Sequence, residues 1–205
     1  AITRRLRNRG VMSGIITTES PESALERLAE ATRYDDVDFV RTVTTDQDYS
    51  WDEPALEPGA PGYRILVTDC GLKYNILRLL RQRGCEVTAV PATMPAEEML
   101  AMKPDGILLS PGPGDPQLLD YLVSNVQKLV GRVPMMGICL GHQILARAMG
   151  AQTFKLKFGH RGGNHPVKDL SDGRVYITAQ NHGYAVSADS LRAGLEISHI
   201  NLNDD

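Results

Sequence analysis

One cysteine of the chain stands in a pattern typical of an activated nucleophile. Cys139 lies in the pentad GICLG, between Gly137 and Gly141, where an apolar run gives way to an amphipathic one. Small flanking residues permit the strained strand-to-helix turn that exposes a nucleophile. A helix that starts directly after Cys139 offers unpaired N–H groups, which we expect to lower the pKa of the thiol and to stabilise an oxyanion. Cys70 and Cys85 lack this setting and are interpreted as structural thiols.

A second loop has the composition needed to receive the negative charge that such an attack creates. Residues 108–116 read LLSPGPGDP, and the alternating Pro and Gly predict a rigid turn with open backbone N–H groups. Hydrolases of this kind take one oxyanion donor from the residue after the nucleophile and another from a neighbouring loop. The candidates are the N–H groups of Leu140 and Gly112. A side chain at position 112 is then expected to obstruct the substrate without touching the core. Taken alone, the loop has a simpler alternative, a tight turn with no binding role.

The alternating sequence patterns after residue 62 predict the strands and helices that must position these loops. Strand-like and helix-like segments alternate, with strands expected at 63–69, 85–91, 105–110 and 133–139 and helices at 73–84, 95–104, 116–132 and 140–150. Such alternation requires right-handed crossovers and predicts an α/β fold with a mostly parallel sheet covered on both faces. Ligands of these sheets bind outside the carboxyl ends of the strands, where both loops fall.

The remaining segments predict the domain organisation. Residues 1–45 contain two helix-like stretches, the second with Ser20 as N-cap, and are too few to bury a core alone. Residues 46–62 are acidic and rich in Pro and Gly, which predicts a linker. Residues 63–205 form the expected main domain, with antiparallel strands added at the edge of the sheet by residues 162–189.

Composition excludes several classes of protein. The 205 residues are 42% hydrophobic and 23% charged with a net charge of −3, which is ordinary for a soluble globular protein. No apolar run approaches the roughly 20 residues that span a bilayer, and no signal-peptide core is visible. We therefore expect a cytoplasmic protein with neither a membrane nor a nucleic-acid partner, and interpret the basic residues at 3–10 as a solvated helix face. Three scattered cysteines predict no disulfide framework and no metal site.

Four segments together resemble a known family. LLSPGPGDP, GICLGHQ, FGHRGGNHPV and AQNHGYAV, in this order, are similar to the glutamine-hydrolysing small subunits of carbamoyl-phosphate synthetases, within the class I (triad-type) glutamine amidotransferases. The first two segments are shared across that class, whereas the last two look specific to the carbamoyl-phosphate branch. The opening AITRRLRNRGVMSGIIT also looks like the end of that subunit's N-terminal domain. The resemblance thus covers essentially the whole chain.

The resemblance implies a three-layer amidotransferase fold in which Cys139 attacks the side-chain amide of L-glutamine. It implies that oxyanion donors and glutamine-binding residues fall at Gly112, Gly114, Leu140, Gln143, Asn181, Gly183 and Tyr184. Gln143 lies one helical turn after Cys139, where its side chain can face the same substrate opening as Cys139. The resemblance implies no cofactor in this chain. Ammonia is expected to pass through a tunnel to a large subunit that uses ATP and Mg²⁺ to make carbamoyl phosphate for pyrimidine and arginine biosynthesis.

One part of the family's catalytic triad has no counterpart. Family members use a His-x-Glu pair, but the five histidines here are followed two positions later by Ile144, Gly162, Val167, Tyr184 and Asn201. We therefore expect a chain truncated at both ends, with residues 1–45 as a remnant of an N-terminal domain, and poor glutamine hydrolysis by these 205 residues alone. Histidines 142, 160, 165 and 182 are interpreted as packing or hydrogen-bonding residues. Two alternatives stay open: a non-catalytic scaffold or regulator, and a different hydrolase with a Cys elbow, such as a γ-glutamyl hydrolase.

Overall fold

The computed structural model describes residues 2–57, 59, 62–192 and 194–203. The described residues form two compact units. Unit 1 takes its residues from 1–37, 154–185 and 197–205, and unit 2 takes its residues from 38–153 and 186–196. The chain therefore enters each unit more than once. Within the described ranges, every helix is too short or too polar to span a lipid bilayer.

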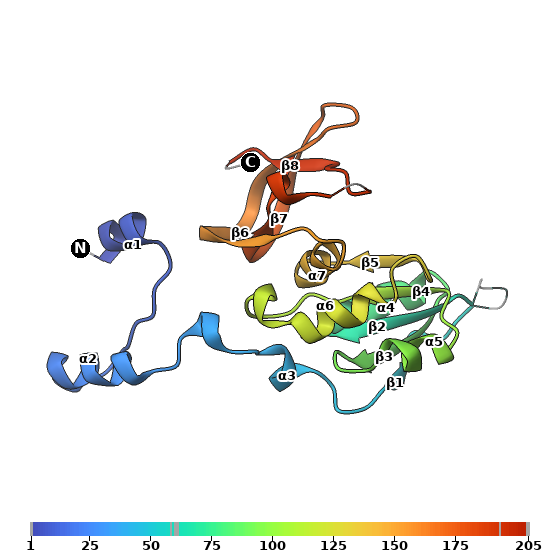
Figure 1. The fold of residues 1–205 in the computed structure, drawn as a ribbon, viewed down its shortest axis with the longest axis horizontal. Helices are drawn as coiled ribbons and strands as arrows, with labels where there is room; N and C mark the ends of the chain where they lie inside the picture. The colour runs from blue at the N-terminus through green and yellow to red at the C-terminus, as the bar shows by residue number, and fades with distance from the viewer. Residues whose placement is uncertain (1, 58, 60–61, 193, 204–205) are drawn as a thin grey trace. The chain divides into compact units, whose positions relative to one another are not determined.

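The described part of unit 2 is built on a five-stranded sheet with the order β1-β3-β2-β4-β5 (Figure 1). Its strands are β1 (Tyr49–Trp51), β2 (Arg64–Asp69), β3 (Glu86–Pro91), β4 (Gly106–Leu109) and β5 (Met135–Gly137). β2 pairs in parallel with β3 and β4, and β4 pairs in parallel with β5, whereas β1 lies antiparallel to β3. The mostly parallel sheet expected from the alternating pattern is confirmed.

Helices cover both faces of this sheet. They are α3 (Val40–Val43), α4 (Tyr74–Gln82), α5 (Ala96–Ala101), α6 (Asp120–Gln127) and α7 (Leu140–Ala148), with short 3₁₀ turns at η2 (Pro116–Leu118) and η3 (Ala188–Ser190). Neighbouring residues of a strand point to opposite faces. Leu66 and Leu109 accordingly pack in the cluster that contains α5, α6 and α7 residues, while Val67 and Leu108 pack with Leu77 of α4. The expected three-layer α/β fold is confirmed in this unit.

The linker expected at residues 46–62 contributes a strand instead. Tyr49 and Trp51 pair with β3 and pack against its buried side chains. Trp51 also stacks on Tyr74 of α4, with ring centroids 5.3 Å apart. Just before this strand, Val40 of α3 is fully buried in the core of unit 2. Turn-forming residues dominate the composition of the segment around β1. For this reason the sequence predicts a linker where the structure has a strand of three residues.

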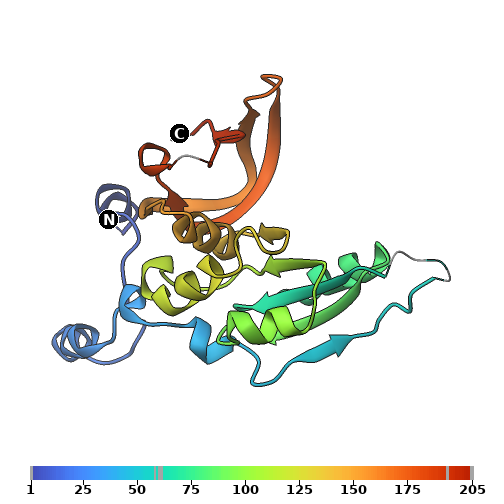
Figure 2. The same ribbon diagram turned by 45° about the vertical axis from the view of Figure 1, so that its right-hand side comes forward.

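Unit 1 joins distant parts of the chain. It contains α1 (Ile2–Arg9), α2 (Pro21–Glu30), η1 (Tyr34–Asp36), nearly all of β6 (Thr153–Asp169) and β7 (Val175–Val186), and β8 (His199–Asn201). Ser20 caps α2 as expected, since its Oγ accepts the Ser23 N–H at 3.3 Å. Figure 2 shows β6 and β7 as long curved ribbons side by side. These strands form a sheet of their own, ordered β7-β6-β8, so the expectation that they extend the parallel sheet is wrong.

Candidate functional site

Three loops of unit 2 meet at the carboxyl edge of its parallel sheet. The chain runs from β2 to β3 on one side and then places β4 on the other side of β2. This order creates a topological switch point between β2 and β4, which is the usual ligand position in open α/β sheets. The loops after β2, β4 and β5 carry residues 69–72, residues 110–115 and Cys139, respectively. The sequence-predicted nucleophile and the Pro-Gly loop are therefore brought to one edge.

Cys139 occupies a strained backbone conformation at the end of β5. It is the N-cap of α7, with φ 53° and ψ −110°. Besides Cys139, Lys103 is the other non-glycine residue with positive φ in the described part of the chain. Such a conformation costs on the order of 1–3 kcal/mol and persists only where the surroundings impose it. The predicted sharp strand-to-helix turn at Cys139 is therefore present.

The two glycines that flank Cys139 are required by close packing. A Cβ on Gly137 would lie 2.4 Å from the carbonyl carbon of Gly141, and a Cβ on Gly141 would lie 2.1 Å from Leu109 O. Ile138 N–H also donates to Leu109 O at 3.0 Å, which holds the turn against the end of β4. Any larger side chain at either glycine would push the turn away from the sheet.

Two opposing effects act on the pKa of the Cys139 thiol. Burial raises the pKa of the Cys139 thiol, and a hydrogen bond from the Leu140 N–H opposes this effect without cancelling it. The start of α7 lowers this pKa through the Leu140 N–H as expected, but the expected net decrease is wrong, because removal of water from around the sulfur outweighs the N–H group. Nucleophilic attack at neutral pH therefore needs a base that takes the thiol proton.

The other two cysteines differ from Cys139 in their surroundings. Cys70 is buried, and burial together with the neighbouring Asp69 charge raises its pKa to about 12. Burial also raises the pKa of Cys85, which lies on the approach to β3 and is partly exposed. Neither cysteine starts a helix. These surroundings agree with their interpretation as structural thiols.

Gly112 packs closely against the loop after β2 and the first residue of α7. A Cβ at Gly112 would lie 2.1 Å from Cys70 O and 2.7 Å from Leu140 Cδ2. Cys70 and Leu140 both belong to the buried core cluster. The expectation that a side chain at position 112 leaves the core untouched is therefore wrong. The same packing brings Gly112 and Leu140, the two predicted oxyanion donors, into contact.

Two further predicted site residues lie in unit 2. Gly114 has φ 92° and directly precedes Asp115, which caps η2 by accepting the Gln117 N–H at 2.8 Å. Gln143 is 5% exposed, and its backbone N–H donates to Cys139 O at 3.1 Å, one helical turn away. Both residues are therefore placed on the elements that carry the Pro-Gly loop and Cys139.

The remaining predicted residues, Asn181, Gly183 and Tyr184, belong to unit 1 and follow one another on β7. Tyr184 is 5% exposed, and its phenol donates to Asp35 Oδ1 at 2.8 Å. A ring nitrogen of His182, Nδ1, lies 2.8 Å from Tyr184 O and fixes the backbone between them. The structure thus groups these residues with each other, and their place around Cys139 stays a prediction.

Three histidines cluster on the sheet of unit 1, two of them joined by a hydrogen bond and the third by a ring contact. His160 Nδ1 lies 3.2 Å from His182 Nε2 and 3.0 Å from Gln180 Oε1. The ring centroids of His160 and His165 are 4.9 Å apart. Burial and the neighbouring imidazoles lower the pKa of His182. These contacts agree with a role in ordering β6, β7 and β8.

His142 lies on α7 of unit 2 and is exposed, although enough protein surrounds its ring to lower the pKa by desolvation.

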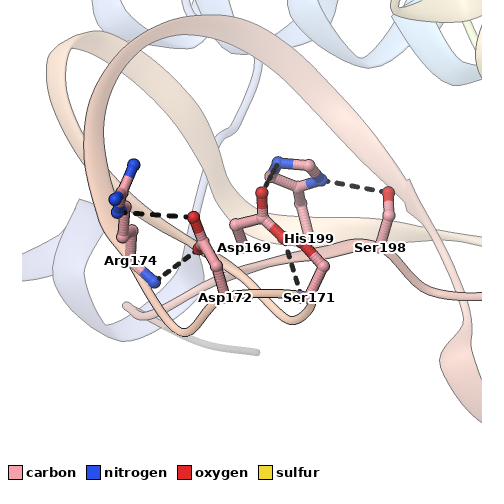
Figure 3. Close-up of polar contacts among 6 residues, drawn as sticks. All are labelled: Asp169, Ser171, Asp172, Arg174, Ser198 and His199. Atoms are coloured by element: carbon pink, nitrogen blue, oxygen red, sulfur yellow. Dashed lines mark hydrogen bonds and ion pairs between the residues drawn. The ribbon is translucent and has the colours of Figure 1, made fainter.

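A serine, a histidine and an aspartate also meet in unit 1, at β8 and the turn after β6 (Figure 3). His199 Nε2 lies 3.5 Å from Asp169 Oδ2, and its Nδ1 lies 3.0 Å from Ser198 Oγ. Asp169 Oδ1 accepts the N–H and the hydroxyl of Ser171 at 2.8 and 2.6 Å, and these bonds lower the pKa of Asp169. The group therefore fastens β8 to a surface turn. In the described ranges, no three His, Cys, Asp or Glu residues are placed to hold a metal ion.

Sequence reasoning missed two residues beside the Pro-Gly loop. Asp69 Oδ1 accepts the N–H groups of Gly71 and Leu72, each at 2.9 Å. Ser110 Oγ accepts the Cys70 N–H at 2.9 Å. An Asp two residues before a Gly at the end of a strand is a turn signal that could have revealed Asp69. No local signal identifies the partner of Ser110, since Cys70 lies 40 positions away.

Comparison with known proteins finds a family model and curated relatives that match most of the chain. The family model described as glutamine amidotransferase class-I matches residues 66–205, which include all the predicted site residues. The carbamoyl phosphate synthase small chain of Oryza sativa subsp. japonica, a chloroplastic protein, is 46% identical over 100% of this chain and 48% of its own length. The corresponding protein of Akkermansia muciniphila is 50% identical over 99% of this chain and 56% of its own length.

The chain spans about half the length of the curated relatives it matches. A solved structure from Thermoplasma acidophilum, described as a GMP synthase component, is also similar. It matches with a TM-score of 0.58 and 23% identity, and the match covers 69% of this chain and 74% of that chain. At this level of identity the likeness shows a shared fold.

Proposed function

Because the chain belongs to the class-I glutamine amidotransferase family, we propose that it is the glutamine-hydrolysing part of a carbamoyl-phosphate synthetase small subunit. Relatives that carry the name carbamoyl phosphate synthase small chain are similar to it over its whole length. The observation that carries the proposal is the strained turn at Cys139, with φ 53°, next to a Gly112 loop packed on Leu140.

In the proposed reaction, the Cys139 thiolate attacks the side-chain amide carbon of glutamine. A bond forms between Sγ and that carbon, and the amide oxygen takes up the negative charge beside the N–H groups of Leu140 and Gly112. Protonation of the amide nitrogen then lets the C–N bond break, so that ammonia leaves and a thioester remains. Water hydrolyses the thioester to glutamate and restores the thiol.

The proposed reaction requires a base, since burial raises the pKa of the Cys139 thiol. The base accepts the thiol proton and delivers it to the leaving nitrogen, which is worth about 10²–10⁴ in rate. The resemblance assigns this role to a His-x-Glu pair, and no such pair occurs in the 205 residues. The chain spans about half the length of its curated relatives, so the activity is proposed for the whole protein.

The proposal extends to substrate and partner. Gly114, Gln143, Asn181, Gly183 and Tyr184 are proposed to bind L-glutamine together with the oxyanion donors. The ammonia is proposed to reach a large subunit, which uses ATP and Mg²⁺ to make carbamoyl phosphate for pyrimidine and arginine biosynthesis. The names of the relatives, which call them small chains, support the existence of that partner. A cytoplasmic location is proposed as well, although the Oryza relative is named as chloroplastic.

Ammonia release from glutamine by the full-length protein tests this proposal. We expect release that the Cys139→Ala variant abolishes, and carbamoyl phosphate synthesis when a large subunit, bicarbonate and ATP are added. Cys139-dependent hydrolysis of γ-glutamyl peptides in place of glutamine would identify a different hydrolase. Binding of a large subunit without any Cys139-dependent hydrolysis would show a non-catalytic scaffold.

A further inference from the structure

A buried hydroxyl joins the two loops that flank the proposed oxyanion site. Ser110 directly follows β4, and its side chain is fully buried. Its Oγ accepts the Cys70 N–H and donates to Pro111 O, each at 2.9 Å. The Ser110 N–H in turn donates to Thr68 O at 3.2 Å. This one residue therefore connects the ends of β2 and β4 through both its backbone and its side chain.

The Pro-Gly loop packs against the loop that follows β2. The site of a Cβ on Gly112 is 2.1 Å from Cys70 O. In the reverse direction, a Cβ on Gly71 would lie 2.9 Å from Pro113 Cδ and 3.3 Å from Gly112 Cα. Asp69 Oδ1 holds the loop after β2 in place by accepting the Gly71 N–H at 2.9 Å. The two loops therefore pack so closely that neither Gly71 nor Gly112 has room for a side chain.

Gly112 also packs against the start of α7. Leu140 Cδ2 lies 2.7 Å from the Cβ position of Gly112, and Leu140 follows Cys139 directly. Gly112 thus packs against both the Cys70 carbonyl and the Leu140 side chain. Oxyanion donors act only within about 2.7–3.1 Å of the charged oxygen. A small displacement of the Pro-Gly loop is therefore enough to misplace the Gly112 N–H.

We propose that Ser110 is a positioning residue for the oxyanion site. Its hydroxyl sets the separation of the Cys70 and Pro111 backbones, and through them the place of the Gly112 N–H relative to the Leu140 N–H. Without the hydroxyl, the buried Cys70 N–H loses its acceptor and regains one only if the loop moves. This inference rests on the proposed function, because it gives Ser110 a role in the hydrolysis of glutamine. Ser110 acts through Gly112 and is assigned no contact with the substrate.

The test is the Ser110→Ala variant of the full-length protein. Functional sites are counted by labelling Cys139 with a chloroketone analogue of glutamine, so that kcat refers to folded molecules only. We expect kcat for glutamine hydrolysis to fall about ten-fold with KM within about two-fold, since complete loss of an oxyanion donor costs about 10²–10³ in kcat. Ser110→Cys retains a weaker hydrogen-bonding group and should lie between Ser110→Ala and the unchanged protein.

A second readout addresses the oxyanion site directly. Glutamate γ-semialdehyde accepts the Cys139 sulfur at its aldehyde carbon, and the former carbonyl oxygen then occupies the oxyanion position. We expect Ser110→Ala to weaken the affinity for this aldehyde about ten-fold, in step with kcat. A purely structural role of Ser110 would lower the melting temperature but change neither kcat per functional site nor the aldehyde affinity.

Thr68→Val is the matched control. The Thr68 hydroxyl is also buried beside this edge of the sheet, and it has no hydrogen-bond partner among the described residues. Its removal should leave kcat and aldehyde affinity unchanged. The inference is overturned if Ser110→Ala keeps both quantities within two-fold of the unchanged protein, and Ser110→Cys decides by the same criterion if Ser110→Ala does not fold. Absence of Cys139-dependent hydrolysis in the unchanged protein would overturn the proposed function and this inference together.

Discussion

The phenol of Tyr184 donates a hydrogen bond to Asp35 Oδ1 at 2.8 Å, although 149 positions separate the two residues. Lys155 Nζ lies 2.6 Å from the same carboxylate oxygen. Tyr184 is 5% exposed and the Asp35 side chain is 24% exposed, so the contact is partly buried. It fastens η1 to the part of β7 that contains Asn181 and Gly183. The N-terminal segment of unit 1 thereby holds a stretch that we propose to bind glutamine.

Loss of the Tyr184 hydroxyl should destabilise the protein through this contact. Tyr184→Phe keeps the buried ring, so we expect a decrease of about 1 kcal/mol in the free energy of unfolding. In an Asp35→Ala background the same change should cost nearly nothing, because its acceptor is gone. Urea denaturation of both single variants and the double variant measures this coupling. The control is Asp36→Ala, whose exposed contact with Arg33 is 3.9 Å long and should matter little. Additive losses would contradict the coupling.

Asp35 should also make stability depend on pH. The hydrogen bond from Lys155, followed by that from Tyr184, holds the pKa of the Asp35 carboxyl below its usual value against the opposing effect of desolvation. A carboxylate with a lowered pKa stabilises the folded state above its unfolded pKa of about 3.9 and loses this contribution as pH falls through its folded pKa. The difference in unfolding free energy between the unchanged protein and Asp35→Asn should therefore be constant above about pH 5 and shrink below about pH 4. Urea denaturation across this range measures it, and a constant difference down to pH 2 would rule out the effect.

Cys139 should be the thiol that a glutamine-like electrophile labels first. The proposed glutamine-binding residues around Cys139 should recognise the reagent and favour reaction at this thiol. Cys70 is buried with a pKa of about 12. Cys85 has a raised pKa and no helix starts beside it. Peptide mapping after treatment with a chloroketone analogue of glutamine at neutral pH measures the distribution. Equal labelling of Cys85 would show that Cys139 has no special reactivity. With small neutral alkylating agents, the raised pKa of Cys139 predicts a rate that climbs about ten-fold per pH unit up to that pKa.

Gly112→Ala should impair both activity and folding. The added Cβ would lie 2.1 Å from Cys70 O, so we expect a loss of about 1–3 kcal/mol in unfolding free energy together with a lower kcat. Gly14→Ala is the control, because nothing lies within 4 Å of a Cβ at that position. Thermal unfolding and glutaminase assays of both variants measure the two effects. A Gly112→Ala protein with unchanged stability and unchanged kcat would remove Gly112 from the proposed site.

Local patterns in the sequence determined most of the parallel sheet and the turn at Cys139. The apolar residues at 65–67 and 106–109 form the centres of β2 and β4, because strands of a parallel sheet are buried on both faces and read as short apolar runs. Gly137 and Gly141 could be interpreted from spacing alone, since a sharp turn between a strand and a helix leaves no room for a Cβ. The place of the Pro-Gly loop followed from the rule that ligand sites lie at carboxyl ends of parallel strands.

Tertiary structure decided what depends on residues far apart in the chain. β1 exists because β3 supplies its hydrogen-bonding partners, and three residues carry too weak a pattern to predict a strand. The direction of the Cys139 pKa shift depends on how much protein surrounds the sulfur, which no local motif encodes. The bonds from Ser110 to Cys70 and from Tyr184 to Asp35 were likewise invisible, because a side chain's hydrogen-bond partner is fixed by packing and not by its position in the sequence.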